Sequence, residues 1–408
     1  MVDSRTIAQR MLRRTGPGFI MAAIVVGPGS ILASSRAGAE ASYDLVWILA
    51  LAALFMAAFT SMGARLGCAL DESPLSLVAG RWGRWAAVIV GLSGFLVATG
   101  FQFGNNIGVA VALSALIPLP IWLWPPFLTA LALVFFLFAR HFYAILEKFI
   151  LVLVLAMLAS FVGNLFFTGF SPAGLVGGFV PKALEENELV IGRAMLGTTF
   201  SAVAAFYQIY LVRAKGWGRG NVSLAIADAW LGIAMLTLIG LVIMMAAAAA
   251  LGGRAGDFDD VGQLASLFGV VLGPWSTVVF CLGLAAAAFS SFIANALVGG
   301  VLMADGLGLG HAVDSRATKA WAGVSLVIGC AVALGVILGE AAGTTSVLVA
   351  QSATLFAAPL CALLLFGLTS SRRIMGDMRN GPVMMLLGLA GLGVVAWLNV
   401  TLLMRILS

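Results

Sequence analysis

The sequence contains few charged and few titratable residues. Asp, Glu, Lys and Arg make up only 10% of its 408 residues, and only two residues are histidines. The four cysteines, Cys68, Cys281, Cys330 and Cys361, lie in or beside apolar stretches without the spacing of a metal site, so we interpret them as buried packing residues. No pairing of a nucleophile with a base and no triad of metal ligands is present. These absences argue against an enzyme, and no cofactor is predicted.

Apolar residues dominate the chain instead. They form 62% of it, and the mean hydropathy is +1.10. No soluble core could bury so much apolar surface, whereas a lipid bilayer accepts it. The sequence therefore predicts an all-α polytopic membrane protein surrounded by the lipid bilayer. Eleven apolar segments are long enough to span it, at 17–42, 44–66, 86–114, 120–139, 148–169, 190–213, 223–251, 267–303, 320–338, 344–368 and 382–404.

Basic residues are distributed unevenly between the segments that connect these spans. Most of the 22 Lys and Arg residues lie in the N-terminal segment and in alternate loops after it. Under the positive-inside rule this places the N-terminus in the cytoplasm and the C-terminus outside. The net charge of +5 is then mainly a signal of topology, and no nucleic acid partner is expected.

The first apolar segment is interrupted near its middle by the sequence from Gly27 to Ser30. Pro28 lacks a backbone N–H, and the glycines on either side of it have low helix preference. Backbone groups freed inside a bilayer must line a cavity, because lipid cannot pair them. We therefore predict a substrate site at this break.

A second interruption is less clear. Small and hydroxyl-bearing residues occupy positions 197–208, in the sixth apolar segment. Broken first and sixth helices are typical of a five-plus-five inverted repeat that holds its substrate between the two breaks. A closely packed helix face explains the same residues equally well, so the residues alone leave both interpretations open.

Several short motifs, taken together, resemble the Nramp (natural resistance-associated macrophage protein) family of metal-ion transporters. The similarity extends in order over essentially the whole chain. The matching patches are Gly16-Pro17-Gly18-Phe19, Gly27 to Ser30, Ala37-Gly38-Ala39, Tyr43, Leu45-Val46-Trp47, Leu146-Glu147-Lys148, Leu196-Gly197, Tyr207, Ser290-Ser291, Thr369-Ser370 and Met375-Gly376-Asp377.

This resemblance implies a LeuT-type inverted repeat of five plus five helices with an eleventh helix added, and with helices 1 and 6 broken. We therefore expect a cytoplasmic N-terminus at 1–16, a first repeat at 17–169 and an extracellular loop at 170–189. A second repeat would follow at 190–368, and an inner loop with the eleventh helix at 369–408. We expect the protein in a bacterial inner (plasma) membrane.

The chain departs from the family at the metal site. In metal-transporting members the first break reads Asp-Pro-Gly-Asn and the sixth-helix break Met-Pro-His, and the Asp, Asn and Met side chains bind the metal together with a sixth-helix carbonyl. The resemblance carries these positions onto Gly27, Ser30 and Ser201, or onto Ala202 if the sixth-helix register shifts by one. The family's helix-ten glutamine falls on Gln351, which is retained. We expect Ser30, Ser201 and Gln351 to bind metal weakly or through water.

Coordination chemistry indicates the consequence. Thioether sulfur favours soft transition metals, so its loss removes a selectivity element against Mg²⁺ and Ca²⁺. A bare divalent ion without an anionic ligand would be poorly compensated at the membrane midplane. Either the ion stays hydrated, as Mg²⁺ tends to, or the transported solute is not a metal ion.

The proton pathway of the family is also missing. The resemblance places its titratable groups on Gly27, Val203, Gln208, Gly100 and Phe103, none of which exchanges a proton. We therefore predict transport without obligatory proton coupling.

Other polar residues lie within the spans or at their ends. Asn105 and Asn106 follow Gln102 at helical spacing, and they either hold waters around a hydrated substrate or hydrogen-bond between helices. Glu40 and Asp44 are candidates for an outer entrance, although Arg36 opposes cation attraction unless it pairs with Glu40. Glu147 and Asp228 lie at inner helix ends, where one of them could form a gate salt bridge.

Three classes of function follow from the sequence. The first is a transporter of hard, largely hydrated divalent cations such as Mg²⁺ or Mn²⁺. The second is a transporter of another small solute on the same scaffold, because fold does not fix substrate. The third is a sensor that does not transport.

Overall fold

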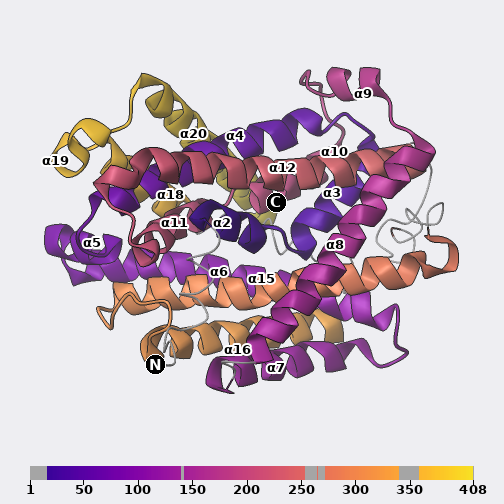
Figure 1. Ribbon diagram of the computed structural model, residues 1–408, viewed down its shortest axis with the longest axis horizontal. Helices are drawn as coiled ribbons and strands as arrows, with labels where there is room; N and C mark the ends of the chain where they lie inside the picture. The colour runs from indigo at the N-terminus through magenta and orange to yellow at the C-terminus, as the bar shows by residue number, and fades with distance from the viewer. Residues whose placement is uncertain (1–15, 139–141, 253–263, 265–271, 340–357, 408) are drawn as a thin grey trace.

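The computed structural model describes residues 16–138, 142–252, 264, 272–339 and 358–407, and every regular element in these ranges is helical (Figure 1). The predicted all-α class is therefore confirmed. The principal helices are α2 (Pro17–Val25), α3 (Pro28–Ala41), α4 (Val46–Ala69), α6 (Arg84–Ser114), α7 (Trp124–Phe138), α8 (Phe142–Thr168), α10 (Glu186–Thr199), α11 (Ala202–Lys215), α12 (Val222–Leu251), α15 (Ser276–Gly306), α16 (Arg316–Leu338), α18 (Ala358–Ser370) and α20 (Pro382–Leu407).

Two of the predicted spans are each divided into two helices. In the first, α2 ends at Val25 and α3 begins at Pro28, with Gly27 as an extended N-cap at φ −128° and ψ −176°. Pro28 occupies the first helical position, where its missing N–H costs no hydrogen bond. In the sixth span, α10 ends at Thr199 and α11 begins at Ala202, with Ser201 as an extended N-cap. The second break is therefore real.

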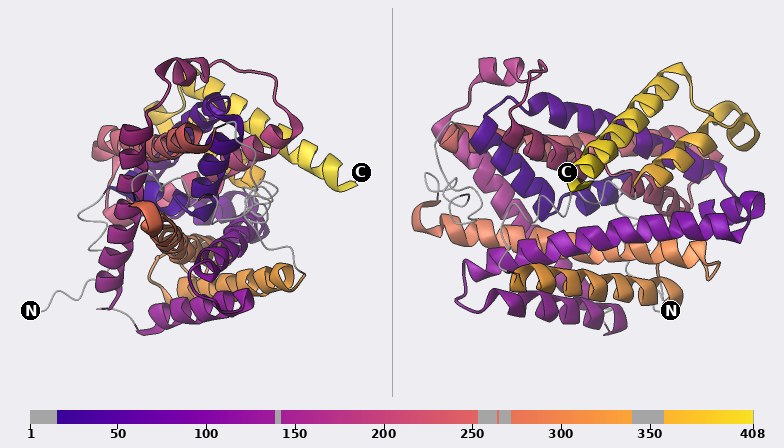
Figure 2. Two further views of the ribbon diagram at one scale, coloured as in Figure 1. Left: turned by 90° about the vertical axis from the view of Figure 1, so that its right-hand side faces the viewer. Right: turned by 180° about the vertical axis from the view of Figure 1, so that it is seen from behind.

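The helices lie in two groups on either side of these breaks. The long helices α6 and α15 run side by side and pack against α16, which lies beside α7 (Figure 2). On the other side, α12 packs against α2, α3 and α4, while α4 packs against α11. The two breaks thus lie between the α6–α15 pair and the α4–α12 side of the molecule.

Glycine allows the closest approach in the second group. A Cβ at Gly232 of α12 would lie 2.1 Å from the carbonyl oxygen of Gly18 in α2. No side chain fits in that space, so α2, the first half of the first span, rests directly on the backbone of α12.

Seven segments of the described chain are long and apolar enough to cross a membrane: 46–69, 84–114, 186–215, 219–251, 273–306, 316–338 and 382–400. The other four predicted spans correspond to the divided α2–α3 segment, to α7 with 15 residues, to α8, and to α18, whose predicted start lies outside the described residues. Two short helices, α5 (Pro74–Trp82) and α9 (Pro172–Gly177), had no counterpart among the predicted spans. The predicted repeat boundaries stay a prediction.

Candidate functional site

A cavity lies between the two helix breaks. The space free of protein atoms there is about 330 Å³, part of it open to solvent. Six helices, α2, α3, α6, α10, α11 and α15, and both breaks contribute to it. The lining residues are Val25, Gly27, Gly29, Ser30, Phe101, Asn105, Thr198, Ser201, Ala204, Ser291 and Asn295. None of these residues carries a charged group or sulfur.

The Ser30 hydroxyl stabilises the first break. It accepts a hydrogen bond from the Gly27 backbone N–H at 3.1 Å and donates to the Gly27 carbonyl oxygen at 2.9 Å. A side chain at the third helical position that reaches back to the N-cap amide is half of a capping box. Ser30 thus has a structural task at the start of α3, while it also borders the cavity.

Ser201 also binds a backbone amide at the start of a helix, here at the second break. Its hydroxyl accepts a hydrogen bond from the Ala204 backbone N–H at 3.3 Å, which makes it a side-chain N-cap of α11. Both hydroxyls that the resemblance placed at the metal site therefore already bind an amide at the start of a half-helix.

Helix ends set the electrostatic character of the cavity. The C-terminal ends of α2 and α10 reach it at Val25 and Thr198. The last carbonyls of a helix lack intrahelical partners and carry the negative end of the helix dipole. The positive ends of α3 and α11 are met by the two serine hydroxyls. Oxygen dipoles are thus the part of the site that suits a cation.

The third side of the cavity comes from α6 and α15. Asn105 of α6 is buried, and its Nδ2 has no hydrogen-bond partner among the described residues. Ser291 of α15 donates to the Val26 carbonyl oxygen at 3.0 Å. A Cβ at Gly27 would lie 2.8 Å from the Ser291 Oγ and 3.6 Å from the Asn105 Oδ1. A side chain at position 27 would therefore point at these two residues.

The structure brings together four of the sequence-predicted site residues, Gly27, Ser30, Asn105 and Ser201. Ala202 is buried at the first turn of α11 and is not part of the cavity lining. Asn106 is also outside the lining, and its Nδ2 donates to the Gln102 carbonyl oxygen one turn earlier at 2.9 Å. Gln351 lies outside the described residues.

Sequence reasoning missed Thr198 and Asn295 as lining residues, and it noted Ser291 only as part of a motif. The four-residue spacing of Ser291 and Asn295 places them on one face of α15. The four-residue spacing was the only sign in the sequence that the two residues belong together. It indicates a site only when this face of α15 is known to lie against both helix breaks.

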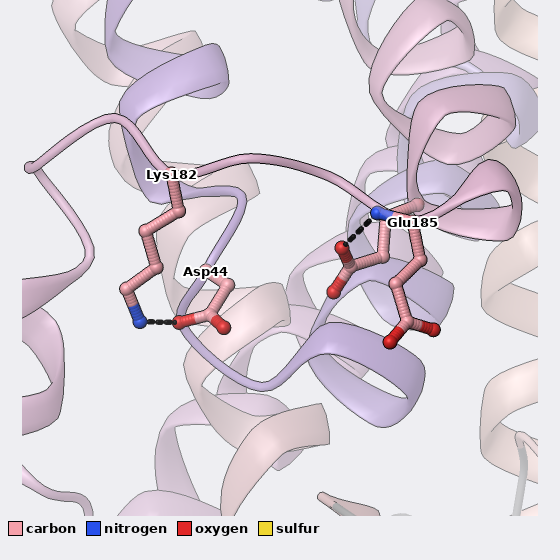
Figure 3. Close-up of polar contacts among 4 residues, drawn as sticks. Asp44, Lys182 and Glu185 are labelled. Atoms are coloured by element: carbon pink, nitrogen blue, oxygen red, sulfur yellow. Dashed lines mark hydrogen bonds and ion pairs between the residues drawn. The ribbon is translucent and has the colours of Figure 1, made fainter.

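Each of the two carboxylates that we predicted at an outer entrance has a basic partner. Glu40 pairs with Arg36 at 2.7 Å on the same helix. Asp44 pairs with Lys182 at 2.5 Å across the loop before α10, where the Glu188 carboxylate also accepts from the Glu185 backbone N–H (Figure 3). Pairing of these charges weakens any attraction of cations to the entrance.

Asp228 of α12, which we predicted at an inner helix end, holds the start of α2. Its Oδ2 accepts a hydrogen bond from the Gly18 backbone N–H at 2.5 Å. The described contact is thus a helix cap at the positive end of α2, not an ion pair with a loop arginine. Glu147 lies in α8, and its side chain is outside the described part of the structure.

A second buried carboxylate was overlooked. Asp305, which no motif in the sequence marked as functional, lies in the last turn of α15 and is 2% exposed. Its carboxylate accepts hydrogen bonds from the Ser73 hydroxyl at 2.7 Å, the Leu75 backbone N–H at 3.3 Å and the Tyr210 hydroxyl at 2.7 Å. It therefore joins α15, α5 and α11.

No group of three or more His, Cys, Asp or Glu side chains that could hold a metal ion occurs in the part of the chain that the structure describes. Any ion in the cavity would depend on neutral oxygen ligands.

Known proteins that are similar to this chain share its whole length. The divalent metal cation transporter MntH of Mycobacterium tuberculosis is 26% identical over 98% of this chain and 93% of its own. Among solved structures, a variant of the manganese transporter of Eremococcus coleocola has a TM-score of 0.79 at 17% identity, over 98% of this chain and 87% of that one. Mhp1, a nucleobase-cation-symport-1 family transporter with bromovinylhydantoin bound, has a TM-score of 0.58 at 17% identity, over 98% and 96% of the two chains.

These structural likenesses establish a LeuT-type fold, as predicted. The family model described as natural resistance-associated macrophage protein-like matches residues 18–405. The chain is therefore an integral membrane protein of the Nramp family.

Proposed function

We propose that this protein transports divalent metal cations and favours hard, largely hydrated ions such as Mg²⁺ and Mn²⁺. Family membership supports divalent cation transport, because the relatives include proteins named for divalent metal and manganese transport. The observation that carries the finer proposal is the neutral cavity between the two breaks, whose lining offers hydroxyl, amide and carbonyl oxygen but no carboxylate and no sulfur.

The donor set argues for hard ions. Oxygen donors suit Mg²⁺, Ca²⁺ and Mn²⁺, whereas soft sulfur ligands select other metals. Ser30 and Ser201 would be weak direct ligands, because each hydroxyl oxygen already accepts an amide hydrogen bond. Each retains a second lone pair that could accept from a metal-bound water. Water-mediated contact therefore fits these two residues better than direct ligation.

The expected absence of proton coupling rests on the residues that replace the titratable groups of the family. Gln208 is fully buried in α11, and neither of its amide atoms has a hydrogen-bond partner among the described residues. Val203 is buried one turn earlier in the same helix. Neither side chain can take up and release a proton, so the driving force would be the gradient of the cation itself.

A transporter of a different small solute is the second candidate. A cavity that presents only neutral hydrogen-bonding groups also suits an uncharged polar molecule. The same fold occurs in Mhp1, solved with a hydantoin bound, and fold does not fix substrate. A sensor without transport is the third candidate.

Uptake of a panel of divalent ions into proteoliposomes distinguishes these proposals. We expect Mg²⁺ and Mn²⁺ to enter, and Cd²⁺ to gain no more than about a tenfold advantage over either because the thioether is absent. Empty liposomes provide the control. Entry of none of the ions would refute cation transport, and a Cd²⁺ preference of several orders of magnitude would refute the assignment of hard-ion selectivity.

A further inference from the structure

We propose that Ser291 and Asn295 of α15, together with Asn105 of α6, form a hydrogen-bonding wall that binds the water ligands of the transported cation. The inference rests on the proposed function and names the part of the protein that would select a hydrated ion. We call these three residues the α15 wall, after the helix that carries two of them.

The residues of the α15 wall lie on α6 and α15, two unbroken helices, and they face both helix breaks. Ser291 and Asn295 are four residues apart and line the same cavity as Val25 and Thr198 at the carbonyl ends of α2 and α10. Ser291 also touches the first break directly, since its hydroxyl donates to the Val26 carbonyl oxygen. An ion placed between the breaks would therefore have these side chains opposite the carbonyl ends.

Asn105 is the second, independent observation. Its side chain is 1% exposed and lines the cavity, and its Nδ2 has no partner among the described residues. Buried amide groups are normally hydrogen-bonded, and an unpaired one calls for an explanation. A water in the cavity that is not bound to the metal accepts from this N–H group, while the Asn105 Oδ1, 3.6 Å from the position of a Cβ at Gly27, can accept from a metal-bound water.

The chemistry of the wall suits water better than bare metal. Amide and hydroxyl side chains are neutral and both donate and accept hydrogen bonds. They cannot offset the charge of a fully dehydrated divalent ion, whose desolvation penalty is large. They can accept hydrogen bonds from waters that the metal polarises. The wall would therefore hold the ion through its remaining water shell.

The carbonyl ends of α2 and α10 limit how many waters remain. Carbonyl oxygens are themselves hard ligands, so the ion would exchange some waters for them and keep those that face the wall.

The test compares apparent affinities for Mg²⁺ and Mn²⁺ in proteoliposome uptake. We expect Asn295→Ala and Asn105→Ala to weaken Mg²⁺ uptake affinity by about threefold to tenfold, as for loss of one hydrogen bond. Mn²⁺ should lose less, because Mg²⁺ gives up water more reluctantly. Asn295→Asp should bind both ions at least as tightly as the wild type, since the carboxylate accepts from water and adds a charge.

Two variants serve as matched controls. Ser290→Ala removes a neighbouring hydroxyl that does not line the cavity, and Asn399→Ala removes an asparagine of α20 whose Nδ2 donates to the Val395 carbonyl oxygen of its own helix. Both should leave the ratio of the Mg²⁺ and Mn²⁺ affinities unchanged. Size-exclusion profiles confirm that each variant is folded.

The outcomes separate the two proposals. A wild-type protein that carries neither ion overturns the proposed function and this inference with it. The inference alone is overturned if the wild type carries either ion but the alanine variants lose equal affinity for Mg²⁺ and Mn²⁺, and if Asn295→Asp is as impaired as Asn295→Ala. The α15 wall would then be a packing feature. Unchanged affinities in all three alanine variants, including Ser291→Ala, overturn it as well.

Discussion

The absence of a side chain at position 27 determines what the cavity can bind. The backbone there is extended, with φ at −128°, so other residues could adopt it. The Ser291 hydroxyl occupies the space next to the missing side chain. The Ser291 hydroxyl can lie where it does because position 27 carries glycine and not the aspartate of metal-transporting family members.

Restoring the acidic group should convert the site to direct metal ligation. Gly27→Asp alone meets the Ser291 Oγ, which lies 2.8 Å from the new Cβ, so Ser291→Ala is added to make room. We expect the double variant to bind Mn²⁺ about tenfold more tightly, or about 1.4 kcal/mol, measured by isothermal titration calorimetry.

Gly27→Asn with Ser291→Ala is the matched control, because it has the same size without the charge, and it should gain little. An unchanged affinity in Gly27→Asp with Ser291→Ala, with or without Ser30→Asn and Ser201→Met, would show that position 27 does not reach the ion. Ser201→Met also removes the N-cap of α11, which costs about 1 kcal/mol, so its thermal stability must be measured alongside.

At the scale of elements, the sequence predicted the first break from Pro28 and its neighbouring glycines. It did not decide the second break, because small residues in the sixth span also fit an unbroken helix. The resemblance to a family favoured the break, and Ser201 shows why it is stable there, since its side chain caps the new helix without any proline. Such a cap is a tertiary detail that hydropathy does not reveal.

Asp305 could not be interpreted from sequence, because its partners come from residues 73–75 and 210. Asp305→Ala should lower the free energy of unfolding by about 3 kcal/mol or more, since it leaves the buried Tyr210 hydroxyl and the Leu75 backbone N–H without the carboxylate that accepts from them. Tyr210→Phe removes one hydrogen bond and should cost about 1 kcal/mol.

Denaturation in detergent measures both changes. Ser160→Ala, which loses a hydroxyl bond to the Ala156 carbonyl oxygen of its own helix, is the control and should remain near the wild type. Equal stability of Asp305→Ala and Tyr210→Phe would contradict a carboxylate that joins three helices.

At the scale of the whole molecule, composition alone predicted the class, and most helix boundaries lie within a few residues of the apolar segments. The location of the cavity also followed from the breaks. Its α6–α15 side did not follow, because polar residues within a span can either line a cavity or bond to neighbouring helices. Asn105 lines the cavity, whereas Gln102, one turn earlier in α6, donates from its Nε2 to the Phe292 carbonyl oxygen of α15.

The cytoplasmic position of the N-terminus stays a prediction of the positive-inside rule. The central claim concerns the whole transport cycle: a neutral site moves a hydrated divalent cation without a proton. Flux should then follow the gradient of the cation and be largely indifferent to an imposed pH step, because the residues at the family's proton positions do not titrate.

The most direct measurement uses proteoliposomes that contain a pH-sensitive dye and a dye that reports Mg²⁺ or Mn²⁺. After the ion is added outside, the account predicts that the metal signal rises while the internal pH stays constant. Acidification that depends on the added ion and on the protein would contradict the account, and it would direct attention to Glu40, Glu147 and Asp228 as proton carriers.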